Sequence, residues 1–465
     1  MNEVTLETIT SLAKRRGFVY PTSEIYGGLA SSYDYGPLGT ELLRNIRSLW
    51  WRELIHKRPD MVGLDSQILL HPETWVASGH VASFTDPLVE DQITHKRYRA
   101  DHLLEQWLAA NPGVDDIAVE ELSLAEMGEF IERYKVLSPE GNAISKPKAF
   151  NILFESAIGA VEGEKSKVYL RGETAQGIFS NFRQIVDSSR VRLPFGVGQI
   201  GKSFRNEITT GQFVFRTLEF EQAEIEFFFD PEQSPWEPIF KDWQEAMWQF
   251  VTKTLGISEE NLRWRRHSDK ERSFYSKETY DLDYQFPFGF QELWGIAYRT
   301  DYDMQAHLQH SGRKLEYIDA QNNGKRVVPH VIEPALGINR VFLMLLCDAY
   351  WEDTENQRTV LRFKPSIAPY KAAVFPLLKN KPELVEKARG IFNNLLDHMT
   401  VTWDDRGNIG KRYYYQDEIG TPFCVTVDFD TLEDDSVTVR DRDSAAQERV
   451  HVSQLLAYLQ QRING

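Results

Sequence analysis

Strand-like segments rich in Phe, Ile and Val dominate residues 168–361 of this chain, and an apolar helix is predicted over residues 340–351. Ahead of this stretch, apolar residues recur at helical spacing over residues 42–54, and Pro59 ends that run. Residues 61–70 then have the composition of a strand. The pattern predicts a large domain built around a β-sheet.

Two further regions differ from this β-rich stretch. Residues 87–165 indicate an insertion, in which residues 115–132 carry seven acidic residues and no basic one, as a solvated helix would. The Pro-rich residues 363–369 indicate a linker. Beyond it, an α/β module of about 100 residues is predicted from alternating strand and helix patterns at 371–376, 382–397, 423–428, 436–440 and 452–462.

One motif is formally present but in the wrong context. Residues 196–203 match the phosphate-loop pattern GxxxxGK[ST], whose backbone N–H groups cradle phosphates at a helix N-terminus. A phosphate loop follows a buried parallel strand and opens a helix, whereas Arg192-Leu193-Pro194-Phe195 precedes this one and strand composition follows it. We therefore reject the phosphate loop and predict a strand.

We interpret the same region as a β-hairpin whose side chains could bind a nucleotide. Residues two apart in a strand share a face, so Arg205 and Glu207 point the same way. On the return strand, one face carries Arg216, Leu218, Phe220, Gln222 and Glu224. Forked guanidinium donors suit a triphosphate, and an aromatic ring with a carboxylate suits an adenine and its amino group. The alternative for any isolated Arg-x-Glu is a solvated charged strand face.

Three segments resemble the signature motifs of class II aminoacyl-tRNA synthetases, in the order and spacing of that family. Phe204-Arg205-Asn206-Glu207, a loop, and Phe215-Arg216-Thr217-Leu218-Glu219-Phe220-Glu221-Gln222 resemble the second motif. The helix that ends near Arg58, with Gly36-Pro37, resembles the first. The third is matched by Glu333-Pro334-Ala335-Leu336-Gly337-Ile338-Asn339-Arg340.

Other segments resemble the homodimeric glycyl-tRNA synthetases within that class: residues 23–39, 75–80, 169–179 and 292–303, and residues 409–443 resemble their anticodon-binding domain. The resemblance implies an α+β catalytic domain on a mixed, mainly antiparallel sheet of six to seven strands, with an insertion and a C-terminal α/β anticodon-binding domain. The expected parts are residues 1–86 (catalytic domain with the dimer-forming first motif), 87–165 (insertion), 166–362 (catalytic core) and 363–465 (anticodon-binding domain).

The resemblance also implies how ATP is held. Arg205 would contact the α-phosphate, Arg216 and Arg340 the β- and γ-phosphates, and Glu292 a Mg²⁺ ion bound to them. Phe220 and Arg340 would sandwich the adenine, with Glu207 accepting from its amino group. These four residues, Arg205, Arg216, Arg340 and Glu292, are the expected catalytic set. The full ATP-binding set implied is Arg205, Asn206, Glu207, Phe215, Arg216, Thr217, Leu218, Glu219, Phe220, Glu292, Leu293, Gly337, Ile338, Asn339 and Arg340.

For glycine, the family's pocket meets the ammonium with carboxylates, which map to Glu173, Glu224 and Glu333, and the carboxylate with Arg299. Crowded charged groups leave no room for a methyl, which matters because one methylene changes binding by only about 1–3 kcal/mol. The full glycine-binding set implied is Arg99, Glu173, Phe220, Glu221, Gln222, Ala223, Glu224, Arg299, Glu333, Pro334, Ala335, Leu336 and Gly337.

The chain departs from the family pattern at five positions. Ala335 stands where Ser is usual, Asn339 where Asp is usual, and Leu218 where Arg is common. Ala223 replaces Met or a similar residue, and Gly172 occupies a position that is often Pro. Since the Arg and Glu set is complete, we expect an active enzyme.

The charge needs an explanation, because 53 basic and 69 acidic residues give −16, and phosphate contacts are made by Lys and Arg. The bases cluster at residues 14–16, 96–99, 263–267 and 411–412, where we expect tRNA to pass. Two cysteines, Cys347 and Cys424, give no basis for a zinc site of cysteine pairs. Without a signal-like or membrane-spanning apolar run, we expect a cytoplasmic protein with no membrane partner.

The sequence therefore predicts a homodimeric glycine–tRNA ligase that uses ATP and Mg²⁺, with glycine and tRNA(Gly) as substrates and no zinc. One alternative is a synthetase-like accessory subunit that binds nucleic acid without catalysis, although Arg205, Arg216 and Arg340 all remain. Another is a class II synthetase for serine, threonine or proline. Residues 172–176 and 294–301 speak against it, and no editing domain is visible.

Overall fold

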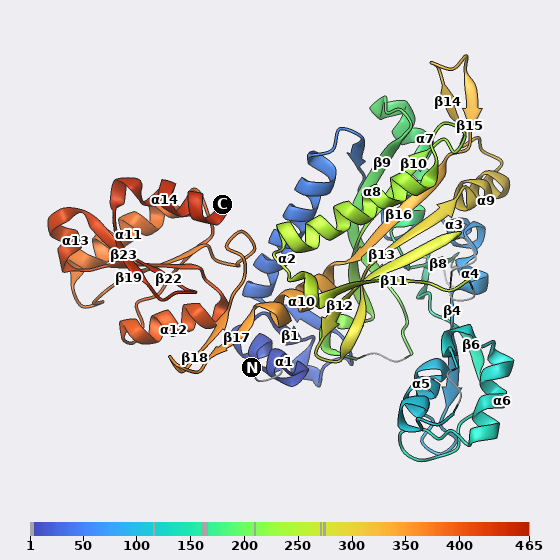
Figure 1. Ribbon diagram of the computed structural model, residues 1–465, viewed down its shortest axis with the longest axis horizontal. Helices are drawn as coiled ribbons and strands as arrows, with labels where there is room; N and C mark the ends of the chain where they lie inside the picture. The colour runs from blue at the N-terminus through green and yellow to red at the C-terminus, as the bar shows by residue number, and fades with distance from the viewer. Residues whose placement is uncertain are drawn as a thin grey trace.

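The computed structural model describes residues 4–114, 117–159, 166–208, 211–269, 272 and 276–464. Among them, seven strands form the central sheet, in the order β11-β12-β13-β16-β10-β9-β3. Neighbouring strands run antiparallel except β3 and β9, which are parallel. The mixed, mainly antiparallel sheet expected from the sequence is thus confirmed (Figure 1).

The N-terminal part supplies the elements α1 (Leu6–Arg16), β1 (Val19–Pro21), β2 (Tyr33–Tyr35), α2 (Pro37–Trp51), β3 (Met61–Gly63), α3 (Pro72–Ala77) and α4 (His80–Ser83). The strand predicted over residues 61–70 was wrong beyond Gly63. The reason is that the Arg171 guanidinium takes the Ser66 and Gln67 carbonyl oxygens at 2.8 and 3.4 Å, so the chain leaves the sheet there.

The core contributes α7 (Ala175–Ser189), β9 (Phe195–Phe204), β10 (Glu219–Phe229), α8 (Trp236–Gln249), β11 (Leu262–Arg266), β12 (Glu278–Phe286), β13 (Gly289–Thr300), α9 (Tyr302–Ser311), β14 (Tyr317–Asp319), β15 (Lys325–Val327), β16 (His330–Gly337), α10 (Ile338–Ala349), β17 (Tyr350–Asp353) and β18 (Arg358–Leu361). All of residues 196–203 lie within β9, so the decision against a phosphate loop is confirmed.

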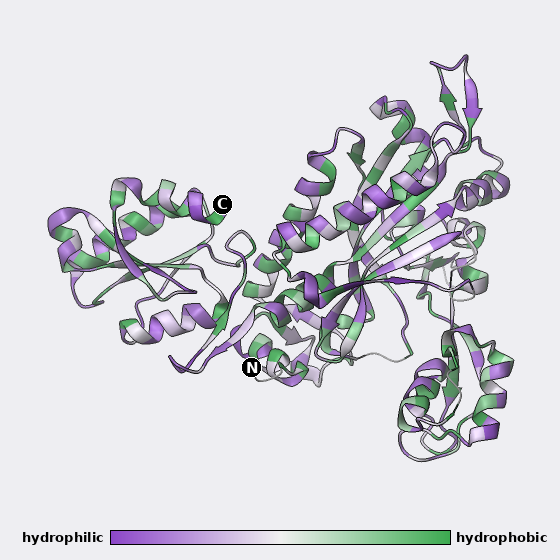
Figure 2. Cartoon of the chain, in the orientation of Figure 1, coloured by the Kyte–Doolittle hydropathy of each residue, from purple (hydrophilic) through white to green (hydrophobic). Residues whose placement is uncertain are grey.

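Two apolar layers cover the two faces of the sheet. Residues of α2, α8 and α10 pack on one face, with Ala223, Ile225 and Phe227 of β10 among them. On the other face, α7 and α9 pack on Phe228. The helices carry both hydrophobic and hydrophilic residues, as helices that cover a sheet do (Figure 2).

The region of the predicted insertion forms a small separate core. It contains β4 (Thr85–Glu90), β5 (Arg97–Arg99), α5 (Ala100–Ala110), α6 (Leu124–Tyr134) and β6 (Lys148–Asn151), followed by the hairpin β7 (Glu155–Ile158) and β8 (Ser166–Tyr169). The helix expected over residues 115–132 begins later, because Ser123 and Glu126 form a capping box that starts α6. Asp115 and Asp116 lie outside the described residues.

The C-terminal module contains β19 (Ala372–Pro376), α11 (Pro382–Leu396), β20 (Val401–Trp403), α12 (Ile409–Ile419), β21 (Phe423–Val427), α13 (Phe429–Asp434), β22 (Ser436–Asp441), β23 (Gln447–His451) and α14 (Val452–Asn464). Its strands form a mixed sheet in the order β20-β19-β21-β22-β23 with its own apolar core. Figure 1 shows this module at the left of the part that holds the central sheet and the insertion at its lower right. Among the described residues, no helix is both long and apolar enough to cross a membrane.

Candidate active site

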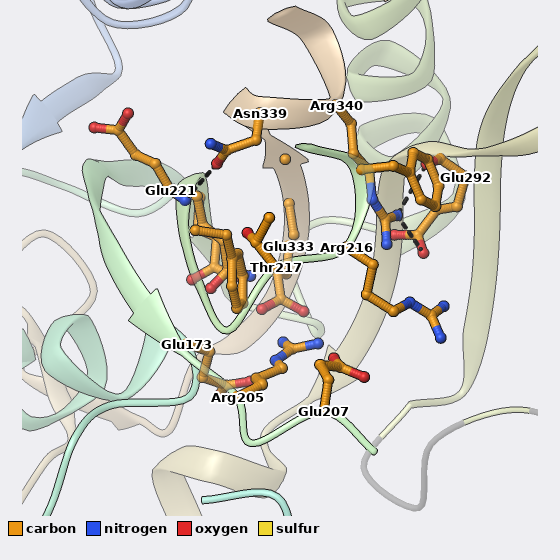
Figure 3. A pocket seen from close by; sticks show the side chains of 16 residues that line it. Glu173, Arg205, Glu207, Arg216, Thr217, Glu221, Glu292, Glu333, Asn339 and Arg340 are labelled. Atoms are coloured by element: carbon orange, nitrogen blue, oxygen red, sulfur yellow. Dashed lines mark hydrogen bonds and ion pairs between the residues drawn. The ribbon is translucent and has the colours of Figure 1, made fainter. Parts of the chain in front are cut away.

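A pocket opens over β10 and β16, on the side of the sheet covered by α7 (Figure 3). The residues that line it are Glu173, Arg205, Glu207, Phe215, Arg216, Thr217, Phe220, Glu221, Gln222, Glu224, Glu292, Glu333, Ala335, Gly337, Asn339 and Arg340. The alternation of β10 explains the polar floor. Ala223 and Ile225 point into the apolar layer under α10, so Gln222 and Glu224 point into the pocket.

The three predicted arginines approach this pocket from different elements. Arg205 follows the end of β9, where its Nε donates to the Gly172 carbonyl oxygen at 3.1 Å. Its guanidinium lies 5.2 Å from the ring centroid of Phe220. Arg340, in the first turn of α10, lies 4.4 Å from the ring of Phe215. Two cations thus lie against two aromatic rings, an arrangement suited to planar and anionic groups together.

Arg216 reaches the pocket by a different route. Its Nη1 donates to Nε2 of His102 on α5 at 3.4 Å. This hydrogen bond joins the insertion to the loop before β10 that carries Arg216. Burial, with the nearby Arg99 and Arg216, lowers the pKa of His102 to about 4 in spite of Asp101. His102 is therefore neutral at pH 7 and can accept that hydrogen bond.

Glu292 forms an ion pair with Arg340, Oε2 to Nη1, at 2.9 Å. Asp281 on the neighbouring strand lies close by, because a Cβ placed on Gly295 would stand 3.7 Å from Glu292 Oε1 and 3.6 Å from Asp281 Oδ1. Burial and Glu292 raise the pKa of Asp281. Glu292 lines the pocket next to arginines suited to phosphates, and this lining fits a Mg²⁺ ion completed by phosphate oxygens. Asp281 does not line the pocket, and its Oδ2 binds Arg265 at 2.5 Å and His267 at 2.7 Å. The sequence interpretation missed Asp281.

The deeper end of the pocket gathers the three glutamates expected to meet an ammonium. Glu224 accepts from the Thr174 backbone N–H at 2.8 Å and from Nε2 of Gln222 at 2.8 Å. Glu173 accepts from Gln176 Nε2 at 2.9 Å and lies 3.4 Å from Nε2 of His80. Glu333 accepts from Nη1 of Arg299 at 2.7 Å. All three are buried, so the pocket places concentrated negative charge out of water.

These carboxyls differ in their pKa. Burial raises the pKa of Glu173, but His80 and Arg299 outweigh it and hold that pKa well below its usual range. Burial and the charge of Glu173 raise the pKa of Glu224. Burial, with Glu224 and Glu173, raises the pKa of Glu333 to about 8 in spite of Arg299. Within the cluster, Glu333 and Glu224 therefore hold a proton more readily than Glu173 does.

Two residues expected to touch glycine do not line the pocket. Arg299 is 1% exposed, and it binds Asp303 through Nε and Nη2 at 2.8 and 2.9 Å as well as Glu333. Arg99 pairs with Asp86 at 3.0 Å and with Asp101 at 2.5 Å beside the insertion. Their contacts to glycine stay predictions. Asp303, which holds Arg299 in place, lies at the end of the 292–303 segment that carried the resemblance, but the sequence alone gave it no role.

Several other predicted residues also lie away from the lining. They are Asn206, Leu218, Glu219, Ala223, Leu293, Pro334, Leu336 and Ile338. Leu293, Leu336 and Ile338 belong to the apolar core, where they support the pocket from behind. Glu219 is paired with Lys202 at 2.9 Å at the open side.

Asn339, one of the departures from the family pattern, has a defined place. Its Oδ1 accepts from the Glu221 backbone N–H at 2.7 Å, and its Nδ2 donates to the Tyr35 hydroxyl. The Glu221 side chain in turn binds Arg47 of α2, with Nη2 to Oε2 at 2.7 Å. The contacts of Glu221 with Asn339 and with Arg47 thus join all three motif segments at one residue of β10.

The expected basic clusters are largely neutralised. On β11, Arg263, Arg265 and Arg266 pair with Asp283, Asp281 and Glu278 of β12 at 3.0, 2.5 and 2.6 Å. Arg412 is 2% exposed and binds backbone carbonyl oxygens, among them that of Pro376 at 2.6 Å. Antiparallel pairing and helix burial thus give these four arginines partners that the linear sequence hides, whereas Lys411 beside Arg412 is exposed.

Comparison with known proteins agrees with this architecture. Residues 160–349 match the family described as tRNA synthetase class II core domain (G, H, P, S and T), and residues 371–462 match the anticodon binding domain. A glycine–tRNA ligase of Clostridium acetobutylicum is 49% identical over 99% of this chain and 99% of its own length. Those of Bacillus cereus and Staphylococcus haemolyticus are 48% and 47% identical, each over 98% of this chain and 99% of their own. This chain belongs to the glycine–tRNA ligase family of class II synthetases.

Proposed function

We propose that this protein activates glycine with ATP to glycyl-adenylate and pyrophosphate, and then esterifies the 3′ end of tRNA(Gly) with the glycine. The observation that carries the proposal is one pocket that holds three arginines at its open end and three buried glutamates at its deep end. The first group suits a triphosphate and the second a small ammonium.

The chemistry needs no acid–base residue. The glycine carboxylate attacks the α-phosphorus in line and pyrophosphate leaves, so positioning and charge neutralisation lower the barrier. Arg205 would neutralise the α-phosphate, and Arg216 and Arg340 the leaving pyrophosphate. Glu292 would hold Mg²⁺, which would supply further positive charge to the phosphate oxygens.

Glycine selection would follow from charge and space. Glu173, Glu224 and Glu333 would surround the ammonium, and Ala335 lies on the same pocket lining where the family usually has a hydroxyl. Arg299 is fixed by Asp303 and binds Glu333, so it would hold the Glu333 carboxylate in place beside the ammonium.

The assembly that we propose is a homodimer formed through the first-motif region. The segment before α2 carries Ile25, Tyr26 and Leu29, which are 87%, 86% and 60% exposed and would be covered by a second copy. Light scattering at micromolar concentration would show twice the chain mass. The chain would divide into the four parts expected from the sequence. A tRNA substrate favours a cytoplasmic location.

The decisive test is amino-acid-dependent pyrophosphate exchange with all twenty amino acids. We expect exchange with glycine and at least 100-fold less with alanine, since the expected pocket excludes a methyl as well as failing to reward it. Exchange absent with glycine, or faster with another amino acid, contradicts the proposal. Exchange absent with every amino acid, together with tRNA binding, would favour the non-catalytic accessory subunit instead.

A further inference from the structure

Directly below the ammonium pocket lies a carboxyl group that the proposed reaction does not use. Glu226 is 0% exposed, and among the described residues neither of its side-chain oxygens has a hydrogen-bond partner. It continues the polar face of β10, two residues beyond Glu224. A buried ionised carboxylate without donors is strongly unfavourable in free energy, so this position calls for a proton.

The sheet register puts a second carboxyl opposite it. Glu224 pairs with Ala335 and Phe227 with Ile332, so Glu226 lies across from Glu333 on β16. Side chains at opposed positions of neighbouring strands stand on the same face, with Cβ atoms about 4.5–5.5 Å apart. Glu333 has the Arg299 guanidinium at 2.7 Å, whereas Glu226 has no such donor.

The groups that face Glu226 are mainly acidic. They come from four elements: Glu333 on β16, Arg299 on β13, Asp303 on α9 and Glu224 on β10 itself. Its neighbour on β9 is the apolar Val197. Burial, followed by Glu333, raises the pKa of Glu226 well above its usual range. One cation therefore faces four carboxyl groups, counting Glu226.

We propose that Glu226 is a positioning residue of the ammonium pocket, which carries a proton in the glycine-free enzyme and loses it when the glycine ammonium binds. The O–H bond of the carboxylic acid breaks, its electron pair stays on the oxygen, and the proton leaves to the solvent buffer. The incoming positive charge favours the ionised form, because opposite charges attract strongly where water is excluded. The inference rests on the proposed function, since it takes glycine as the ligand.

The consequence is that the binding of glycine itself ionises the Glu226 carboxyl group. A neutral ligand of similar size brings no charge to offset the ionised carboxyl, so it would bind without releasing the proton. Since binding releases a proton, the affinity for glycine rises as the pH rises through the range in which Glu226 holds it. Arg299 and Glu333 transmit this change to the ligand, so Glu226 acts without touching glycine.

The test is isothermal titration calorimetry of the full-length enzyme with glycine alone at pH 7.5, in phosphate and in Tris, whose ionisation enthalpies differ. For the unmodified enzyme we expect the binding heat to depend on the buffer, with about 0.3 to 1 proton released per glycine. Glu226→Gln keeps the shape and the neutral form, so its proton release should fall to less than half of that value, the remainder coming from Glu333, with the glycine affinity changed less than tenfold.

The matched control is Glu245→Gln, the same substitution on the exposed side of α8, which should release as many protons as the unmodified enzyme. Heats that do not depend on the buffer in the unmodified enzyme overturn the inference without any variant. Equal proton release from Glu226→Gln overturns it too, because another group then supplies the proton. If pyrophosphate exchange with glycine persists in either case, the proposed function stands while this inference falls.

Discussion

At the scale of single residues, Arg205 links the two ends of the pocket. Its Nε is fixed by the Gly172 carbonyl oxygen at 3.1 Å, and the rings of Phe84 and Phe220 lie 5.1 and 5.2 Å from the guanidinium. A cation held this rigidly requires little reorganisation when charge develops on a phosphate. Arg205→Ala should therefore reduce glycine-dependent pyrophosphate exchange about 10²–10³-fold in kcat, by analogy with the loss of one preorganised donor.

The control for Arg205 is Arg326→Ala. Arg326 is half exposed and also paired, with Glu316 at 2.9 Å, but it lies on β15, away from the pocket. This variant should retain exchange within a factor of two. A loss of less than tenfold for Arg205→Ala, with an unchanged melting temperature, would remove Arg205 from the catalytic set.

At the scale of elements, the start of α2 is held by backbone contact against Phe18, the residue before β1. The Gly36 N–H donates to the Phe18 carbonyl oxygen at 3.0 Å, and a Cβ on Gly39 would stand 1.9 Å from that same oxygen. Gly39→Ala must push the helix away from Phe18. We expect the variant to lose about 1–3 kcal/mol of stability, measured as an earlier midpoint of denaturant unfolding.

Gly390→Ala gives the comparison, because both glycines lie inside helices and the two changes affect the unfolded chain alike. A Cβ on Gly390 of α11 would meet no atom within 4 Å, so alanine should gain up to about 1 kcal/mol from helix propensity. Destabilisation by both, or by neither, would show that the close contact of α2 with Phe18 is not what limits Gly39.

Elements also show what sequence could and could not predict. The period of two along 219–229 predicted that Gln222 and Glu224 share the pocket face, and continued by two residues it would have found Glu226. The same argument does not hold for Arg216, since Phe213–Phe215 is a 3-10 turn and β10 begins only at Glu219. Arg216 reaches the pocket through the loop and through His102, a contact between segments 114 residues apart.

Long-range pairing accounts for the remaining differences. Asp281 and Asp303 were given no role, and the acidic partners of the β11 arginines, where tRNA is expected to pass, were not identified. Each of these contacts depends on which residue of another strand or helix lies opposite, as Asp281 of β12 lies opposite Arg265 of β11. A single sequence contains the residues of such pairs but not the register that brings them together. The second and third signature motifs, in contrast, are continuous segments and could be identified directly.

At the scale of the whole molecule, a buried carboxylate couples the catalytic part to the C-terminal module. Asp417 on α12 is 0% exposed and binds Arg358 of β18 at 2.8 Å and Arg440 of β22 at 2.7 Å. Asp417→Asn would leave two buried guanidinium groups without their shared anion, which costs about 3–5 kcal/mol when one partner of a buried pair is removed. The damage should concentrate where β18 meets the C-terminal sheet.

Because the pocket lies over β10 and β16, far along the chain from Asp417, the two half-reactions should separate in this variant. We expect aminoacylation of tRNA to fall at least tenfold while glycine-dependent pyrophosphate exchange stays within about twofold, since only the first needs both ends of the molecule. Asp430→Asn, the same change at an exposed position of α13, should leave both rates unchanged. If exchange falls in parallel with aminoacylation in Asp417→Asn, the coupling reaches the pocket itself, and the anticodon-binding module is part of the folding unit that builds the active site.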